Sequence, residues 1–79
     1  MLENIKVGDR IINRLGEEAV IVMIRYSIRG LVKLTFNRAI TGWIKERPKR
    51  SWYYTEEGKF VRNLTDNYGS DITKVIKDV

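Results

Sequence analysis

The sequence predicts a small all-β barrel of five or six strands, with at most one short helical turn. Turn-forming residues recur at short intervals, at Gly8-Asp9, Gly16, Gly30, Gly42, Pro48, Gly58, Asp66-Asn67 and Gly69-Ser70. The segments between these turns are rich in Val, Ile, Thr, Phe, Tyr and Trp. Short β-rich segments at such close spacing are typical of barrels and sandwiches.

The length and the residue types present limit what this chain can be. It has 79 residues, with no cysteine and no histidine, and we expect one domain over residues 1–79. A chain of this size buries only about 60% of its unfolded surface, so its core is thin. Without cysteine and histidine there is no disulfide, no thiolate nucleophile and no usual zinc site. We therefore expect no metal and no cofactor.

The first half of the chain predicts a strand that follows a Gly8-Asp9 turn, and then a hairpin. In the segment 19–28 one face carries Val20, Val22, Ile24, Tyr26 and Ile28, which we expect to be buried. The segment 31–37 places Val32, Leu34 and Phe36 on one face. A three-residue loop, Arg29-Gly30-Leu31, pairs Ile28 with Val32, Tyr26 with Leu34 and Ile24 with Phe36, which keeps the apolar faces together. The outward face then carries Arg25, Ser27, Lys33 and Thr35, with Arg29 at the tip.

The segment W-Y-Y-T-E-E-G-K-F, residues 52–60, predicts a second hairpin. Its loop is Glu56-Glu57-Gly58, a turn that glycine closes in the left-handed region. In this register the core side carries Trp52, Tyr54, Phe60 and Leu64, and Arg62 lies at the rim, over Trp52. We expect Tyr53 to face outward. The aromatic residues of this segment are therefore expected to build the core for the most part.

The last segment, residues 71–79, fits two structures. Its apolar residues Ile72, Val75, Ile76 and Val79 lie at helical spacing. The segment is also β-branched almost throughout, which favours a strand. We predict a strand.

The positive charge is concentrated in the middle of the chain. The net charge is +5, yet residues 19–50 hold eight basic residues and one acid, a balance of +7. This asymmetry favours an anionic partner, although a solvated basic surface has the same composition. In the segment 38–50 Trp43 either stacks on a base or fills the core between Ile40 and Ile44. The candidate binding residues are Arg25, Arg29, Lys33, Arg38, Trp43, Lys45, Arg47, Lys49, Arg50 and Tyr53.

Catalysis is the least supported function. The paired carboxylates, Glu17-Glu18 and Glu56-Glu57, lie in predicted turns, where solvent surrounds them and nothing raises their pKa. The sequence also has no glycine-rich phosphate-binding pattern. We expect a protein that is not an enzyme.

Two motifs resemble known groups of proteins. The start, K-V-G-D-R-I-I-N-R-L-G-E-E-A-V-I-V-M-I, resembles small Src-homology-3-like barrels, in which a "V-G-D-x-V" strand and a glycine turn lead into a long bent strand. The second half is similar to small bacteriophage and prophage proteins with a "T-x-[DE]-G-[KR]-[FY]" hairpin and a closing "D-I-[VT]-K-V" strand. The matching residues are Thr55, Glu57, Gly58, Lys59, Phe60, Asp71, Ile72, Thr73, Lys74 and Val75. The resemblance implies a phage origin and no particular chemistry.

These observations lead to two alternative functions. In the first, the chain is a binding module that holds nucleic acid or a nucleotide with its basic face and loop. In the second, it is a phage inhibitor or adaptor that docks on a host protein, either with an exposed strand edge or with the same basic surface against an acidic surface of that protein. No segment has the roughly 20 apolar residues that span a bilayer, and no signal peptide is evident. We expect the cytoplasm of an infected or lysogenic bacterial host, no membrane association, and either a monomer or an oligomer.

Overall fold

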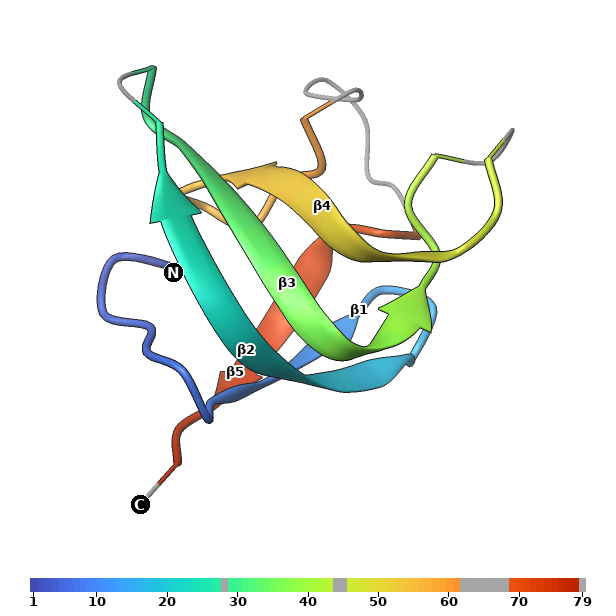
Figure 1. Ribbon diagram of the computed structural model, residues 1–79, viewed down its shortest axis with the longest axis horizontal. Helices are drawn as coiled ribbons and strands as arrows, with labels where there is room; N and C mark the ends of the chain where they lie inside the picture. The colour runs from blue at the N-terminus through green and yellow to red at the C-terminus, as the bar shows by residue number, and fades with distance from the viewer. Residues whose placement is uncertain (28, 44–45, 62–68, 79) are drawn as a thin grey trace.

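Five antiparallel strands form one sheet in the computed structural model, which describes residues 1–27, 29–43, 46–61 and 69–78 (Figure 1). The strands are β1 (Arg10–Asn13), β2 (Glu18–Tyr26), β3 (Leu31–Ile40), β4 (Lys49–Thr55) and β5 (Ile72–Ile76). The sheet order is β4-β3-β2-β1-β5. The described residues include no helix, and so none that is long and apolar enough to cross a membrane. The all-β prediction is confirmed, and β5 confirms the predicted strand in the last segment.

The sheet curls until its two ends meet. The first residues of β2 pair with β1, and the rest of β2 pairs with β3. At the far end, the turn after β4 contacts the start of β5, because the Ile72 amide donates a hydrogen bond of 2.8 Å to the Gly58 carbonyl. Figure 1 shows β5 and β1 lying behind the ribbon of β2, β3 and β4. The result is a small barrel-like sheet around one core.

Aromatic rings fill the centre of this core. Trp52 and Phe60 meet edge to face with their centroids 5.6 Å apart, and Tyr54 contacts Phe36 at 6.3 Å and Phe60 at 6.2 Å. Edge-to-face packing of this kind stabilises a core beyond the burial of area alone. The buried apolar residues are Leu2, Ile5, Ile11, Ala19, Ile21, Val32, Leu34, Phe36, Ile40, Trp52, Tyr54, Phe60 and Ile72.

The predicted core face of β2 is wrong in its first half. Ala19 and Ile21 are buried, whereas Val20 is only partly buried and Val22 is 48% exposed. The cause is a β-bulge, because Ile21 pairs with Phe36 while Met23 pairs with the adjacent Thr35. Val22 is the extra residue, and an extra residue shifts the alternation of side chains by one. The strict alternation assumed from the sequence therefore holds only after the bulge, where Ile24 packs against the core.

The loop between β2 and β3 has the predicted length, but its position in the sequence differs from the prediction. The Ser27 amide donates to the Leu31 carbonyl at 2.8 Å, and the glycine between them has a φ of +75°. The loop is therefore one residue earlier than predicted, and Tyr26 pairs with Val32 instead of Leu34. A shift of two residues in the pairing keeps each side chain on its face, but it places Tyr26 beyond the core, where it is 63% exposed. Ile28, which was expected in the core, lies outside the described residues.

The second hairpin has the predicted register. Tyr54 is opposite Phe60, the Thr55 amide donates to the Lys59 carbonyl at 2.9 Å, and Gly58 has a φ of +86°. Trp52 is buried and Tyr53 faces outward, as expected. The predicted positions of Arg62 and Leu64 lie outside the described residues.

Candidate functional site

Three side chains form a row across the outward face of the sheet. Arg25 on β2 is directly opposite Lys33 on β3, and Lys33 is directly opposite Tyr53 on β4. Residues that are directly opposite in adjacent antiparallel strands share one face, so these side chains are neighbours. The Lys33 ammonium lies 5.8 Å from the centroid of the Tyr53 ring, and Tyr53 is 45% exposed. We call Arg25, Lys33 and Tyr53 the cationic row.

A first hollow of about 240 Å³ opens over this row. Its lining residues are Arg25, Tyr26, Ser27, Lys33 and Tyr53. The lining thus combines two cations, two phenol rings and one serine hydroxyl group, and it contains no carboxylate. A ligand that carries negative charge next to a flat ring matches these groups chemically.

A second hollow of about 200 Å³ also borders Tyr53. Its lining residues are Glu46, Lys49, Ser51, Trp52, Tyr53, Phe60 and Val61. The first hollow is lined by residues of β2, β3 and β4, the second reaches the segment that follows β4, and Tyr53 lines both hollows. The Lys49 ammonium lies 5.5 Å from the centroid of the Trp52 ring and 2.9 Å from a Glu46 carboxylate oxygen.

Next to the cationic row, two residues along each strand, the outward face carries a row of neutral side chains. Thr35 on β3 is opposite Ser51 on β4, and their hydroxyl oxygens are 2.8 Å apart. Met23 on β2 is the neighbour of Thr35 on the other side. The described outward face therefore carries positive charge, hydroxyl groups and exposed apolar groups, and its interior side carries the core.

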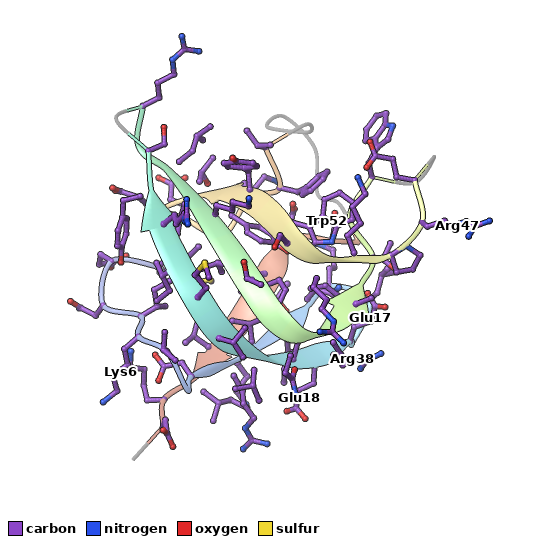
Figure 2. The ribbon with its side chains drawn as sticks, in the orientation of Figure 1. Lys6, Glu17, Glu18, Arg38, Arg47 and Trp52 are labelled. Carbon is purple, nitrogen blue, oxygen red and sulfur yellow. The ribbon has the colours of Figure 1, made fainter. Side chains whose placement is uncertain are left out.

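The structure separates Arg29 and Arg38 from the cationic row. Arg29 is exposed at the β2–β3 turn, where it shares a hollow of about 420 Å³ with Glu56 and Glu57. Those two carboxylates lower the positive potential around the Arg29 guanidinium. The Arg38 guanidinium donates a hydrogen bond of 3.1 Å to the Glu18 carbonyl. Figure 2 shows Arg38 beside the acidic pair at the end of β3, away from Arg47 on the β3–β4 loop.

Glu17 explains why Arg38 is held there. Burial opposes ionisation of this carboxyl, but hydrogen bonds from the Asn13 amide and from Thr41, together with the charge of Arg38, lower its pKa below the usual value. The carboxylate thereby joins the end of β1 to the segment after β3. Arg38 is part of this structural cluster.

The basic loop before β4 is only partly on the same face. Arg47 and Arg50 are exposed, and Lys49 lines the second hollow. Side chains alternate along β4, so Arg50 points away from the face of Ser51 and Tyr53. Lys45 lies outside the described residues.

The Trp43 side chain packs against the hydrophobic core. This packing and its partial burial favour the core interpretation over base stacking. The glycine before it permits the loop to pass close to the core, because a Cβ on Gly42 would lie 2.3 Å from the Trp52 ring. The Trp52 indole also donates a hydrogen bond of 2.9 Å to the Ile40 carbonyl. This end of β3 is therefore tightly fixed to β4.

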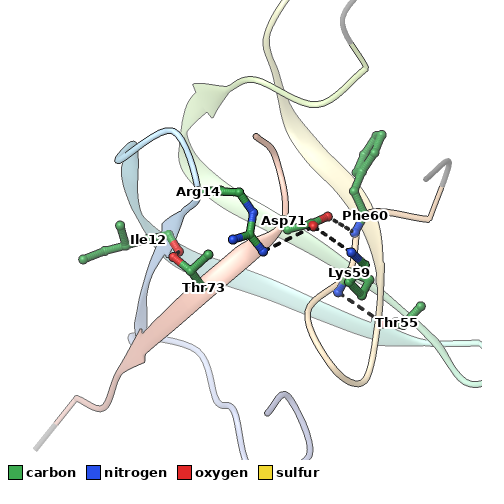
Figure 3. A network of polar contacts seen from close by, with 7 residues as sticks. All are labelled: Ile12, Arg14, Thr55, Lys59, Phe60, Asp71 and Thr73. Atoms are coloured by element: carbon green, nitrogen blue, oxygen red, sulfur yellow. Dashed lines mark hydrogen bonds and ion pairs between the residues drawn. The ribbon is translucent and has the colours of Figure 1, made fainter. Parts of the chain in front are cut away.

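Two buried carboxylates hold cations in another part of the molecule. Asp71 accepts hydrogen bonds from the Phe60 amide at 2.8 Å and from the Lys59 ammonium at 3.1 Å, and lies 3.6 Å from the Arg14 guanidinium (Figure 3). Asp9 accepts from the Lys77 ammonium at 2.6 Å and from the amides of Lys6 and Asp78. Burial opposes its ionisation, yet these donors hold the pKa of Asp9 at about 2. Both networks tie distant segments together.

Tyr26 is the main residue of the first hollow that the sequence reasoning missed. It was assigned to the core because its position has the same parity as Ile24. The position of Tyr26 next to the predicted turn could have indicated its exposure, because the end of a long strand extends beyond a thin core. The prediction included Lys49 and Tyr53 of the second hollow but missed Glu46 and Val61, because these two approach β4 only through the loop and the hairpin.

Comparisons with known proteins found no relative of this chain. No protein-family model, no curated protein and no solved structure matches the chain. The likeness to Src-homology-3-like barrels and to phage proteins thus stays a prediction. Among residues 1–27, 29–43, 46–61 and 69–78, no group of three or more acidic, histidine or cysteine side chains is placed to hold a metal ion.

Proposed function

We propose that this protein is a non-enzymatic module that binds nucleic acid through the outward face of β2, β3 and β4. The cationic row is the observation that carries the proposal. Arg25 and Lys33 are adjacent there and share their hollow with an exposed tyrosine ring.

The charge of the row is uncompensated within the described residues. Neither Arg25 nor Lys33 has a described carboxylate within 4.0 Å, whereas Arg14, Lys59 and Lys77 all contact buried carboxylates. Cations that lack an internal partner attract phosphate groups, and they release counterions when they bind them. Arg47, on the loop before β4, is also exposed.

The aromatic ring in the row favours nucleic acid over an acidic protein surface. A base can stack on an exposed ring while its phosphate meets the adjacent cation. The first hollow is small and concave, whereas a stable protein partner typically covers roughly 800 Å² of each surface. Docking on a host protein through the same cations is the outcome that the experiment below must separate.

The test compares two double variants that lose the same number of charges. Arg25→Ser/Lys33→Ser removes the two cations of the row, and Lys6→Ser/Lys74→Ser removes two exposed lysines from other parts of the molecule. Figure 2 shows Lys6 on the N-terminal segment, away from Trp52 and Arg47. Affinity for a labelled oligonucleotide is measured by fluorescence anisotropy over a series of NaCl concentrations.

We expect the row variant to bind weakly and to lose about one to two units of the slope of log K against log salt. The control variant should keep nearly all of the slope. Equal losses in the two variants would show that only the net charge matters. If the wild-type protein binds no oligonucleotide, and instead captures a host protein in the presence of nuclease, the docking function replaces this proposal.

A further inference from the structure

We infer that the ligand is a single strand, which crosses β4 from the first hollow to the second with a base stacked on Tyr53. This inference rests on the proposed function, because it concerns the same face. It adds the class of nucleic acid, the path of the strand and the residue that selects it.

Tyr53 is the only described residue that lines both hollows. Its ring is 45% exposed, and β4 fixes it between Lys33 on one side and the Val61 segment on the other. In a duplex each base is covered above and below by its neighbours, so its flat face is not accessible to a side chain. An unpaired base presents that face, and stacking on an aromatic side chain is how sequence-tolerant single-strand binding proteins hold it.

Cations border both of the hollows that Tyr53 lines. Arg25 and Lys33 border the first hollow, and Lys49 borders the second. Lys49 is four residues from Tyr53 along β4, which is about 13 Å in an extended strand. This spacing of the backbone positions suits a ligand with several phosphates. A short strand therefore engages both groups of cations, and a mononucleotide engages only one.

Hydroxyl groups occupy the space between the charged groups. Ser51 lines the second hollow, and its hydroxyl group lies 2.8 Å from that of Thr35. Hydroxyl groups donate to phosphate oxygens and to base edges alike. The path thus offers charge, an aromatic ring and neutral donors in sequence, and its described lining contains one carboxylate, that of Glu46.

A tryptophan in the second hollow can report on ligand binding through its fluorescence. Trp52 lines it, next to the Lys49 ammonium. A strand that enters this hollow should displace the lysine from its position over the indole ring, and the Trp52 fluorescence should change. The Trp43→Phe variant removes the only other tryptophan in the sequence, so the signal then belongs to Trp52 alone.

The experiment uses oligothymidylate of eight residues, a hairpin duplex with the same number of phosphates, and thymidine 5′-monophosphate. Anisotropy and Trp52 fluorescence are recorded for the wild-type protein, for Tyr53→Ser and for Tyr53→Phe. We expect the single strand to bind more tightly than the duplex, and the monophosphate to compete only weakly. Tyr53→Ser should weaken strand binding roughly five- to 150-fold, the range for the loss of one stacked base. Tyr53→Phe keeps the ring and should stay within about twofold.

The outcomes separate this inference from the function on which it rests. If Arg25→Ser/Lys33→Ser abolishes binding while Tyr53→Ser leaves the strand affinity unchanged, the module binds nucleic acid but the stacking path is wrong. Equal affinity for strand and duplex also overturns the path, and full competition by the monophosphate shows that the ligand is a nucleotide. If Tyr53→Ser does not fold, the strand-to-duplex ratio and the Trp52 signal of the wild-type protein still decide the question. Absence of all nucleic-acid binding overturns the proposed function itself.

Discussion

Two regions of the sheet hold some of their cations differently. Near β1 and β5, Lys77 contacts Asp9, and both Arg14 and Lys59 contact Asp71. On the outward face of β2, β3 and β4, Arg25 and Lys33 have no such partner among the described residues. The number of basic residues in a segment therefore says less about binding than the number that the fold leaves without a carboxylate. The first kind of cation stabilises the fold, and the second is available to a ligand.

We expect the largest difference in stability between substitutions at two adjacent residues of β3, one facing the interior and one facing outward. Phe36 is buried against Tyr54, and Phe36→Ala should cost about 3–5 kcal/mol of unfolding free energy. That loss is comparable with the whole stability of so small a domain. The neighbouring outward residue is the control, since Thr35→Ala loses one hydroxyl contact and should cost about 1 kcal/mol or less. Urea denaturation measures both, and equal midpoints would mean that the assignment of faces is wrong.

The next effect tests whether the carboxylate networks are structural. Asp71→Ala removes an acceptor that lies 2.8 Å from the Phe60 amide, and it removes a carboxylate that contacts two cations. We expect a loss of about 3 kcal/mol, less than for a fully buried ion pair, because the side chains of Arg14 and Lys59 still reach solvent. Asp71→Asn keeps an acceptor for the amide and should lose roughly half as much. If alanine and asparagine are both neutral in thermal denaturation, this network does not hold the barrel closed.

The smallest effect depends on pH. The folded state holds the pKa of Asp9 at about 2, below its usual 3.8. A carboxyl with a depressed pKa contributes its full stability above its unfolded value, and loses it as the pH falls toward the folded value. Wild-type stability should therefore fall between about pH 4 and pH 2. In Asp9→Asn this part of the fall should be missing, although the variant is less stable at neutral pH.

The outward cations provide the control for that measurement. Arginine and lysine stay charged throughout this pH range, so Arg25→Ser/Lys33→Ser should give an acid profile parallel to the wild-type profile. Denaturation midpoints recorded from pH 7 to pH 2 test both expectations. An Asp9→Asn profile that coincides with the wild-type profile would show that other groups cause the acid sensitivity.

The parts of the fold that local chemistry determines were predictable from the sequence. The 55–60 turn has the residues its conformation requires, with glycine at the one position with positive φ, so its register and the outward position of Tyr53 followed directly. The outward position of Arg25 and Lys33 also survived the error in the β2–β3 loop, because an even shift in pairing does not exchange the faces.

The parts that depend on distant contacts were not predictable. Nothing in the sequence around Arg38 indicates that Glu18 lies beside it, because the curved sheet brings these two residues together. The same applies to the second hollow, which the hairpin assembles from β4 and Val61. A continuous basic segment of sequence therefore became several separate sites in space.

The bulge at Val22 has a consequence for how this chain tolerates change. Val22 is half exposed, so its side chain has little to lose by substitution. Its presence as a residue, however, sets the phase of β2, which pairs with β1 before the bulge and with β3 after it. Removing it would turn either Ile21 or Ile24 out of the core and would straighten the strand that bends the sheet. Over evolutionary time the residue type at position 22 should vary freely, while the number of residues in β2 stays constant. Insertions and deletions in this strand should therefore disrupt the fold more than substitutions at this position do.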